Sequence, residues 1–235
     1  MRFLLPIVFM LLSFGMNSQS KEGYRNISKE DAVKTLQRVN KWFSATPTYS
    51  FSITHTTYAG HNSTVVHEQK RGFFKKYKEG FHSHMVGINT LQNKNFLVTA
   101  DTSQRIILVS DPIKNFENNK LSFEEYVKLL EKATSIKLNE TDKGIILKME
   151  FGKNSPVAAY EFIIGKNDLL QSITIYYANE VKALDGKMVK PKLNVSFSDY
   201  STQVPFNKGE LDESKYFSVN KEALVLKEKY KDYEL

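Results

Sequence analysis

The hydrophobic period of the sequence switches between two values after residue 20, and this order of periods restricts the available folds. Apolar residues recur at helical spacing over Ser28–Phe43 and again over Ser122–Ala133. Between and after these two segments, apolar and polar residues alternate, as they do from Tyr49 to Thr54. Such alternation is typical of antiparallel sheets with one dry face and one wet face. The sequence therefore predicts an α+β protein in the order helix, strands, helix, strands.

Both predicted helices have recognisable starts. Ser28 with Asp31, and Ser122 with Glu125, have the spacing of a capping box. Each helix then carries one apolar stripe, which we interpret as core packing. The stripes consist of Ala32, Val33, Leu36, Val39 and Phe43 in the first helix, and of Phe123, Tyr126, Val127 and Leu130 in the second.

The strands are predicted from alternation and turn signals. Turns recur roughly every 10 to 15 residues, which favours hairpins over parallel crossovers. Gly72 lies inside one predicted strand, where it indicates a β-bulge. The expected strands begin at Tyr49 and then cover Thr64–Tyr77, Phe81–Val86, Leu91–Ala100, Arg105–Ser110, Ile145–Phe151 and Val189–Phe197.

The N-terminus is typical of a secretory signal. Arg2 precedes an apolar stretch, Phe3–Phe14, that is shorter than the roughly 20 residues a membrane-spanning helix needs. Small residues follow, so we expect cleavage after Ser20 or after Ser18. The chain has no cysteine, which excludes lipid attachment to a new N-terminal cysteine and favours a bacterial exported protein. We predict a signal peptide at 1–20, one domain at 21–235, and a soluble periplasmic product.

A long apolar sheet face must be covered, and only two helices are available to cover it. A strongly curved sheet whose concave face holds the helices is the economical solution. Three predicted strand segments have a characteristic local sequence: RGFFKKY from Arg71, NFLVTAD from Asn95 and RIILVSD from Arg105. With these segments, the order of elements resembles the superfamily of LolA, the outer-membrane lipoprotein carrier. With its Tyr-rich end (Tyr230, Tyr233), the chain looks most like carrier-like proteins exported by Bacteroidetes.

The resemblance implies an unclosed β-barrel with a helical lid that carries a lipid or a lipoprotein acyl group. The residues expected to line its hydrophobic hollow are Phe51, Ile53, Phe81, Met85, Leu147, Met149, Phe162, Ile175, Leu193, Val195 and Phe197. The same residues could instead form a closed core without a ligand. The protein would then be a non-enzymatic interaction module of the cell envelope, and both readings stay open.

All five histidines lie between positions 55 and 84, so a metal site has to be considered. His55 and His67 are equidistant from His61, which places them opposite each other if a hairpin turns there. His82 and His84 share a strand face. The segment has no Asp, and its acids, Glu68 and Glu79, are not placed beside these histidines. We therefore interpret the histidines as structural and expect no metal ion and no cofactor.

A basic run interleaved with aromatic residues has the composition of a nucleic-acid surface, but export argues against that partner. We expect its cations, Lys70, Arg71, Lys75, Lys76 and Lys78, to form the solvated face of a strand. Contact with anionic headgroups or an envelope protein is the functional alternative. The sequence contains no nucleophile elbow, zinc-protease motif, Walker motif or dinucleotide motif. We expect a monomeric non-enzyme whose partner is a lipid or an acylated protein.

Overall fold

The computed structural model describes residues 23–113, 123–183, 186–205, 207–221 and 223–235. The predicted signal peptide lies outside these residues. Ser122 also lies outside them, so the second predicted capping box has no structural counterpart to compare. Side chains are described for the second helix from Tyr126 onward.

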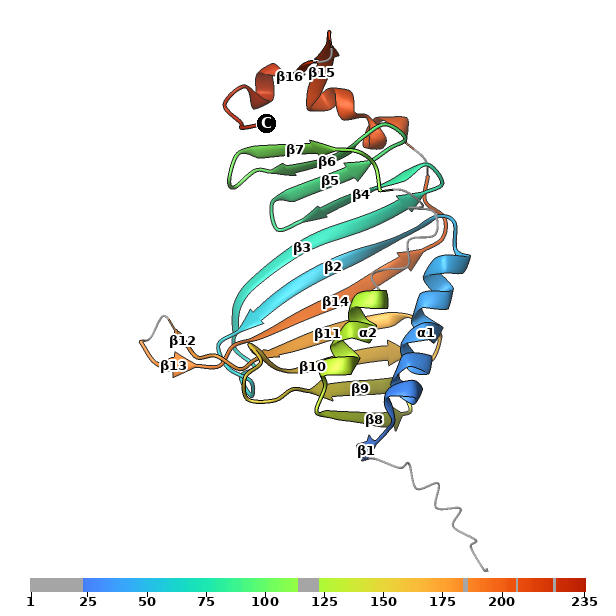
Figure 1. Cartoon of the computed structure of the whole chain (residues 1–235), viewed down its shortest axis with the longest axis vertical. Coiled ribbons are helices and arrows are strands. Elements are labelled where there is room, and N and C mark those ends of the chain that lie inside the picture. The colour runs from blue at the N-terminus through green and yellow to red at the C-terminus, as the bar shows by residue number, and fades with distance from the viewer. Residues whose placement is uncertain (1–22, 114–122, 184–185, 206, 222) are drawn as a thin grey trace, which may run out of the picture.

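The described chain is dominated by one twelve-stranded sheet in which every adjacent pair is antiparallel (Figure 1). Its strand order is β1-β8-β9-β10-β11-β14-β2-β3-β4-β5-β6-β7. Two meanders, β2–β7 and β8–β11, therefore lie side by side and are joined through β14. The strands are β1 (Arg25–Asn26), β2 (Tyr49–Tyr58), β3 (Val66–Tyr77), β4 (Gly80–Met85), β5 (Ile88–Gln92), β6 (Leu97–Asp101), β7 (Ile106–Ser110), β8 (Ser135–Thr141), β9 (Gly144–Glu150), β10 (Val157–Gly165), β11 (Leu170–Tyr177) and β14 (Lys192–Ser201).

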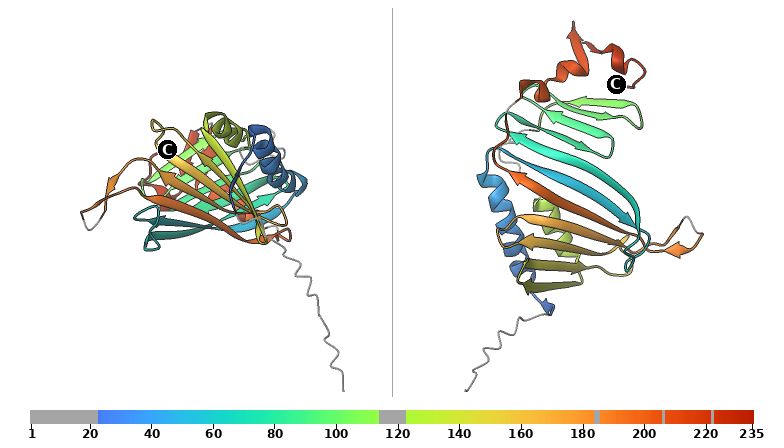
Figure 2. Two further views of the ribbon diagram at one scale, coloured as in Figure 1. Left: turned by 90° about the horizontal axis from the view of Figure 1, so that it is seen from below. Right: turned by 180° about the vertical axis from the view of Figure 1, so that it is seen from behind.

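The sheet is curved and unclosed, and both helices lie against its concave face, as Figures 1 and 2 show. This is the predicted α+β half-barrel. Two small hairpins complete the strand inventory of the described residues. One projects from the molecule, β12 (Val181–Lys182) with β13 (Met188–Val189), and the other lies near the C-terminus, β15 (Phe217–Asn220) with β16 (Ala223–Leu226).

Helix α1 (Lys29–Ala45) begins as predicted at Ser28. The Ser28 side chain accepts a hydrogen bond from the backbone N–H of Asp31 at 3.1 Å, which satisfies one of the free donors of the first turn. The predicted stripe of α1 faces the sheet, with Ala32, Leu36, Val39 and Phe43 buried. Helix α2 (Phe123–Lys132) is shorter and buries Leu130 against the same core.

Strand register divides the side chains of the sheet into an inner, concave face and an outer face. Residues directly opposite each other in an antiparallel pair share a face. Tyr49, Phe51 and Ile53 of β2 contact the helices and so define the inner face. Under α1 and α2, this face forms what we call the inner core, whose buried members are Ala32, Leu36, Val39, Phe43, Tyr49, Phe51, Ile53, Leu130, Ile136, Leu147, Met149, Phe162, Ile164, Leu170 and Ile173.

A second core lies on the opposite face of the same sheet, at the β5–β7 end. Leu91, Val98 and Ile107 point away from the helices and are fully buried under the C-terminal segment. That segment contains η2 (Lys208–Leu211), η3 (Glu213–Lys215), the β15–β16 hairpin and η4 (Glu228–Tyr230). The outer core consists of Leu91, Val98, Ala100, Ile107, Tyr216, Phe217 and Tyr230.

Three details of the predicted strands are wrong. Leu91–Ala100 is two strands, because the side chain of Asn93 accepts hydrogen bonds from the N–H groups of Asn95 and Phe96 and closes a turn. Val189 belongs to the projecting hairpin rather than to β14. Gly72 is no bulge: it pairs regularly with Ile53, and the register shift falls at the end of β2 instead. Gly72 is needed because a Cβ there would lie 2.2 Å from the carbonyl oxygen of His84.

Candidate functional site

The candidate site is the inner face of the half-barrel. Strand register places all eleven predicted lining residues on this face, since each pairs directly or through its neighbours with Phe51 or Ile53 of β2. The helices do not cover all of them equally. Phe51, Ile53, Phe81, Leu147, Met149 and Phe162 are buried, whereas Met85, Ile175, Leu193, Val195 and Phe197 are partly exposed. Whether they contact a ligand stays a prediction.

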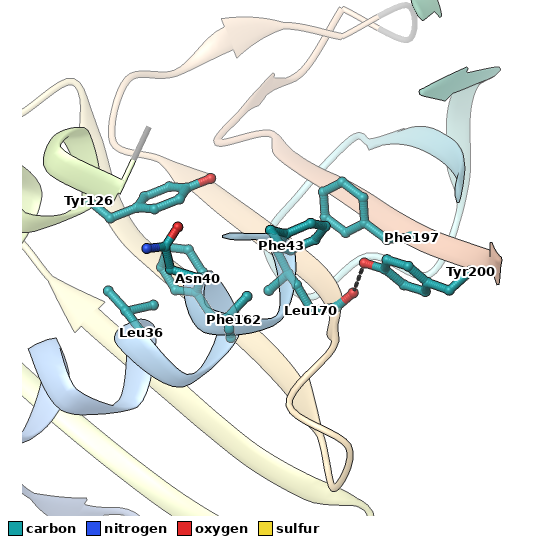
Figure 3. Close-up of a pocket in the computed structure, with 9 residues that line it drawn as sticks. Leu36, Asn40, Phe43, Tyr126, Phe162, Leu170, Phe197 and Tyr200 are labelled. Carbon is teal, nitrogen blue, oxygen red and sulfur yellow. Dashed lines mark hydrogen bonds between the residues drawn. The ribbon is translucent and has the colours of Figure 1, made fainter. Parts of the chain in front are cut away.

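A cavity of about 50 Å³ lies between the two helices and the sheet (Figure 3). Residues from five elements line it, most of them aliphatic or aromatic. They are Leu36, Val39, Asn40 and Phe43 of α1, Tyr126 of α2, Phe162 of β10, Leu170 of β11, and Phe197 and Tyr200 of β14. The cavity is therefore an apolar gap at the junction of α1, α2 and the inner face.

The cavity contains few polar atoms, and one of them lacks a partner. The hydroxyl of Tyr200 donates to the carbonyl oxygen of Leu170 at 2.6 Å, and burial raises its pKa (Figure 3). The side-chain oxygen Oδ1 of Asn40 is buried and has no hydrogen-bond partner among the described residues. No charged side chain lines the cavity within the described part of the chain. The site thus favours an uncharged, mainly apolar occupant.

Beyond the helices, the inner face continues as a partly exposed apolar surface. Ile175 of β11 and Leu193 and Val195 of β14 are partly exposed, and Ile175 and Val195 also pack against the inner core. His55 pairs with Val195 on this surface, and burial lowers the pKa of its imidazole. We call Ile175, Leu193, Val195 and Phe197 the rim. They are partly exposed inner-face residues of β11 and β14, and Phe197 also lines the cavity.

The cavity is too small for an acyl chain as it stands. An apolar cavity of about 150 Å³ holds one benzene molecule, and typical ligand pockets measure roughly 300–1,000 Å³. A volume of about 50 Å³ is well below both. The cavity between the helices and the sheet is therefore closed to a molecule of that size in this conformation.

The prediction that the basic run forms the solvated face of a strand is wrong for Lys75 and Lys76. Lys75 lies on the outer face, where its Nζ donates to Glu210 at 2.9 Å. Lys76 lies on the inner face and is only 5% exposed, with its Nζ 5.6 Å from the ring centre of Tyr49. Alternation along β3 sends neighbouring lysines to opposite faces, and both faces are covered there. Lys70, Arg71 and Lys78 are exposed as predicted.

Glu210 is one of the polar contacts that fix the C-terminal segment to the outer face. Its carboxylate also accepts a 2.6 Å hydrogen bond from the hydroxyl of Tyr77 and lies 3.5 Å from Nδ1 of His82. Burial raises the pKa of Glu210, but the hydrogen bonds from Tyr77 and Lys75 outweigh it and lower the pKa overall. Burial and the charge of Lys215 lower the pKa of His82. This cluster is an attachment point on the face opposite the cavity.

The histidines are not arranged as the hairpin symmetry suggested. His55 pairs with Lys70, while His67 lies at the register shift of β3, so the two do not face each other. His82 and His84 share the outer face, but His84 contacts Asn89 and His82 contacts Glu210. Within the described ranges, no group of three or more His, Cys, Asp or Glu side chains could hold a metal ion.

Sequence reasoning missed part of the cavity lining. The sequence pattern assigns Tyr126 and the apolar residues of α1 to packing only, and it gives no role to Asn40, Leu170 and Tyr200. Asn40 lies four residues after Leu36 and so continues the apolar stripe of α1 on the side that faces the sheet. A polar residue at a stripe position is the sequence signal that points to Asn40. Leu170 and Tyr200 reach the site through strand register, which the sequence does not specify.

No helix in the described part of the chain is long and apolar enough to cross a membrane.

No family model matches the sequence, and no curated protein is significantly similar to it. Solved structures with a similar arrangement include an uncharacterised conserved protein from Thermus thermophilus (TM-score 0.41, 10% identity, covering 77% of this chain and 92% of the other). LprF from Mycobacterium bovis matches with a TM-score of 0.39 at 10% identity, covering 77% of this chain and 97% of the other. A LolA superfamily protein from Nitrosomonas europaea matches with a TM-score of 0.29, the same identity and the same two coverages. The structural neighbours thus include LolA superfamily proteins.

Proposed function

We propose that this protein is a non-enzymatic periplasmic carrier or binding protein that holds a lipid, or the acyl group of a lipoprotein, on the inner face of its half-barrel. The observation that carries the proposal is the continuity of the apolar inner face. It runs from the closed cavity to the partly exposed rim without a charged lining residue at the cavity. A scaffold needs a dry core but has no need of a partly exposed apolar rim.

The free energy of burying an acyl chain is large enough to displace part of the helical cover. Burying an acyl chain contributes about 0.8 kcal/mol per methylene, so a sixteen-carbon chain contributes on the order of 10 kcal/mol before ordering costs. Helix α1 buries four apolar residues, whereas the described side chains of α2 contribute mainly Leu130 and Tyr126 to the inner core. Exposing those two costs roughly 3–6 kcal/mol. We propose that α2, the shorter of the two helices, moves and that α1 stays.

A second candidate function rests on the small size of the cavity. Because the helices fill the hollow to within about 50 Å³, the half-barrel could serve as a permanently closed scaffold for an envelope protein partner. In that case the two helices would not separate, and the rim would be an ordinary partly exposed surface.

Solvent extraction of the natively purified protein, followed by mass spectrometry, tests the carrier proposal directly. We expect an acyl lipid in the extract. Titration of the emptied protein with a lauroyl ligand should change the fluorescence of Trp42. This is the single tryptophan of the chain, and it packs on Phe43, Tyr49 and Tyr200 beside the cavity. Ligand binding should also raise the melting temperature by mass action.

A matched pair of variants locates the site. Val195→Asp places an unpaired charge on the rim and should weaken acyl binding at least tenfold. Asn194→Asp makes the same charge on the next residue, which lies on the outer face beside Thr174, and should leave binding within twofold. If no lipid is extracted from the wild type and it does not respond to acyl ligands, the carrier function is wrong. The scaffold function then remains as the alternative.

A further inference from the structure

Asn40 is placed where a hydrophobic residue would be expected to stabilise the protein. It lies on the sheet-facing side of α1, among Leu36, Val39 and Phe43, and its carboxamide points into the cavity toward Tyr126 and Phe162 (Figure 3). Asparagine is a weaker helix former than leucine. Its oxygen Oδ1 is also buried without a hydrogen-bond partner in the described structure. The position is therefore unfavourable for stability on two independent counts.

A buried polar atom without a partner calls for an explanation, because almost all such atoms in folded proteins are paired. The Tyr200 hydroxyl, which also lies at the cavity, does not supply the missing hydrogen bond. The Tyr200 hydroxyl already donates to Leu170, and it lies on the opposite wall of the site. A bound molecule that brings its own hydrogen-bond donor into the cavity would satisfy Asn40.

We propose that Asn40 is the polar anchor that selects acyl ligands with an uncharged hydrogen-bonding group next to the chain. This inference rests on the proposed carrier function and deepens it by naming the ligand class. A glycerol hydroxyl or the N–H of an N-acyl amide can donate to Oδ1 of Asn40, while the chain extends along the inner face toward the rim.

The surroundings of Asn40 exclude a charged head at this point. An ionised carboxylate or phosphate would enter an apolar cavity that has no cationic lining residue, and its desolvation would be uncompensated. The nearby cation of α1, Arg38, is paired with Asp168 at 2.6 Å and is not part of the lining. The chemistry therefore favours neutral acyl lipids over free fatty acids.

Two neutral probes with the same chain test the anchor. Monolauroylglycerol carries hydroxyl donors, whereas methyl laurate has none. We expect the wild type to bind monolauroylglycerol about tenfold more tightly, which is the effect of one buried hydrogen bond. In Asn40→Leu this preference should fall to within twofold, while methyl laurate binds at least as well as before. Gln37→Leu makes a similar change on the exposed side of α1 and should retain the preference.

The melting temperature without ligand separates an anchor from a structural residue. An anchor held at a cost to stability predicts that Asn40→Leu melts at the same temperature as the wild type or higher. A preference that persists in Asn40→Leu would overturn the proposal, as would equal binding of both probes by the wild type or a clearly lowered melting temperature of this variant. If the wild type binds neither probe, the carrier function itself is wrong.

Discussion

Replacing Phe162 by alanine tests the assignment of the two cores to opposite faces. Phe162 is 1% exposed, packs edge-on against Tyr126 with ring centres 5.4 Å apart, and stacks on Tyr160 at 6.3 Å. Phe→Ala in a packed core costs about 3–5 kcal/mol, including the cavity that remains. Two aromatic partners, worth about 0.5–1.5 kcal/mol each beyond burial, place Phe162→Ala in the upper half of that range.

Phe217→Ala is the matched control on the outer face. Phe217 is also 1% exposed, but among the described residues its one close aromatic partner is Phe96, at 5.3 Å. Its replacement should cost about 3–4 kcal/mol. Urea denaturation gives both free energies of unfolding, and Trp42 fluorescence gives the affinity for a lauroyl ligand. We expect Phe162→Ala to change that affinity severalfold and Phe217→Ala to leave it within twofold.

Two results would contradict this assignment of the ligand and of the inner core. If both variants changed ligand affinity alike, the ligand could not be confined to the inner face. A cost below about 1 kcal/mol for Phe162→Ala would mean that the inner core is loosely packed, contrary to its 1% exposure. Should Phe162→Ala be too unstable to study, Phe162→Leu retains most of the volume and should show the same selectivity for the inner face.

Three shorter predictions concern other parts of the molecule. Folding lowers the pKa of both His82 and Glu210, so the unfolded chain binds protons more readily than the folded protein. The free energy of unfolding should therefore fall as the pH drops below about 6.5, and again below about 4.5. Urea denaturation of Glu210→Gln should show a free energy of unfolding about 1.5–3 kcal/mol lower at pH 7.5 and a flatter pH dependence. Gly72→Ala should destabilise the protein strongly or prevent folding, since its Cβ meets the backbone of β4 at 2.2 Å; a melting temperature close to the wild type would show that β3 and β4 separate easily. Intact-mass measurement of the exported protein should find a start between Ser18 and Lys21, and retention of Phe3–Phe14 would contradict the predicted signal.

The inner face was predictable because it depends on local periodicity. Alternation with period two assigns each strand residue to a face regardless of which strand lies beside it. Phe51, Leu147 and Val195 could therefore be assigned to the same face before their partners were known. Ser28 was predictable for a similar reason, since its hydrogen bond to Asp31 lies within one helical turn.

The outer core was not predicted, although the sequence holds its signal. In β5–β7, apolar side chains occur on both faces of the sheet. Leu91, Val98 and Ile107 are buried on the outer face, whereas Ile88 and Leu108 are exposed on the inner face. Such strands need cover on the outer side, which the alternation elsewhere does not require. The covering segment lies far away in sequence, and only the register and the packing of Tyr216, Phe217 and Tyr230 reveal it.

The sequence distance between the two halves of the outer core has a consequence for biosynthesis. The side chain of Asn93 binds the carbonyl oxygen of Leu211, 118 residues further along the chain, and Tyr230 comes later still. Until the ribosome has made those residues, the outer surfaces of β5, β6 and β7 have nothing to cover them. Contacts this distant form slowly, and exposed strand surface of this kind invites aggregation. The nascent chain therefore depends on delayed folding, or on a chaperone, until its last part is available.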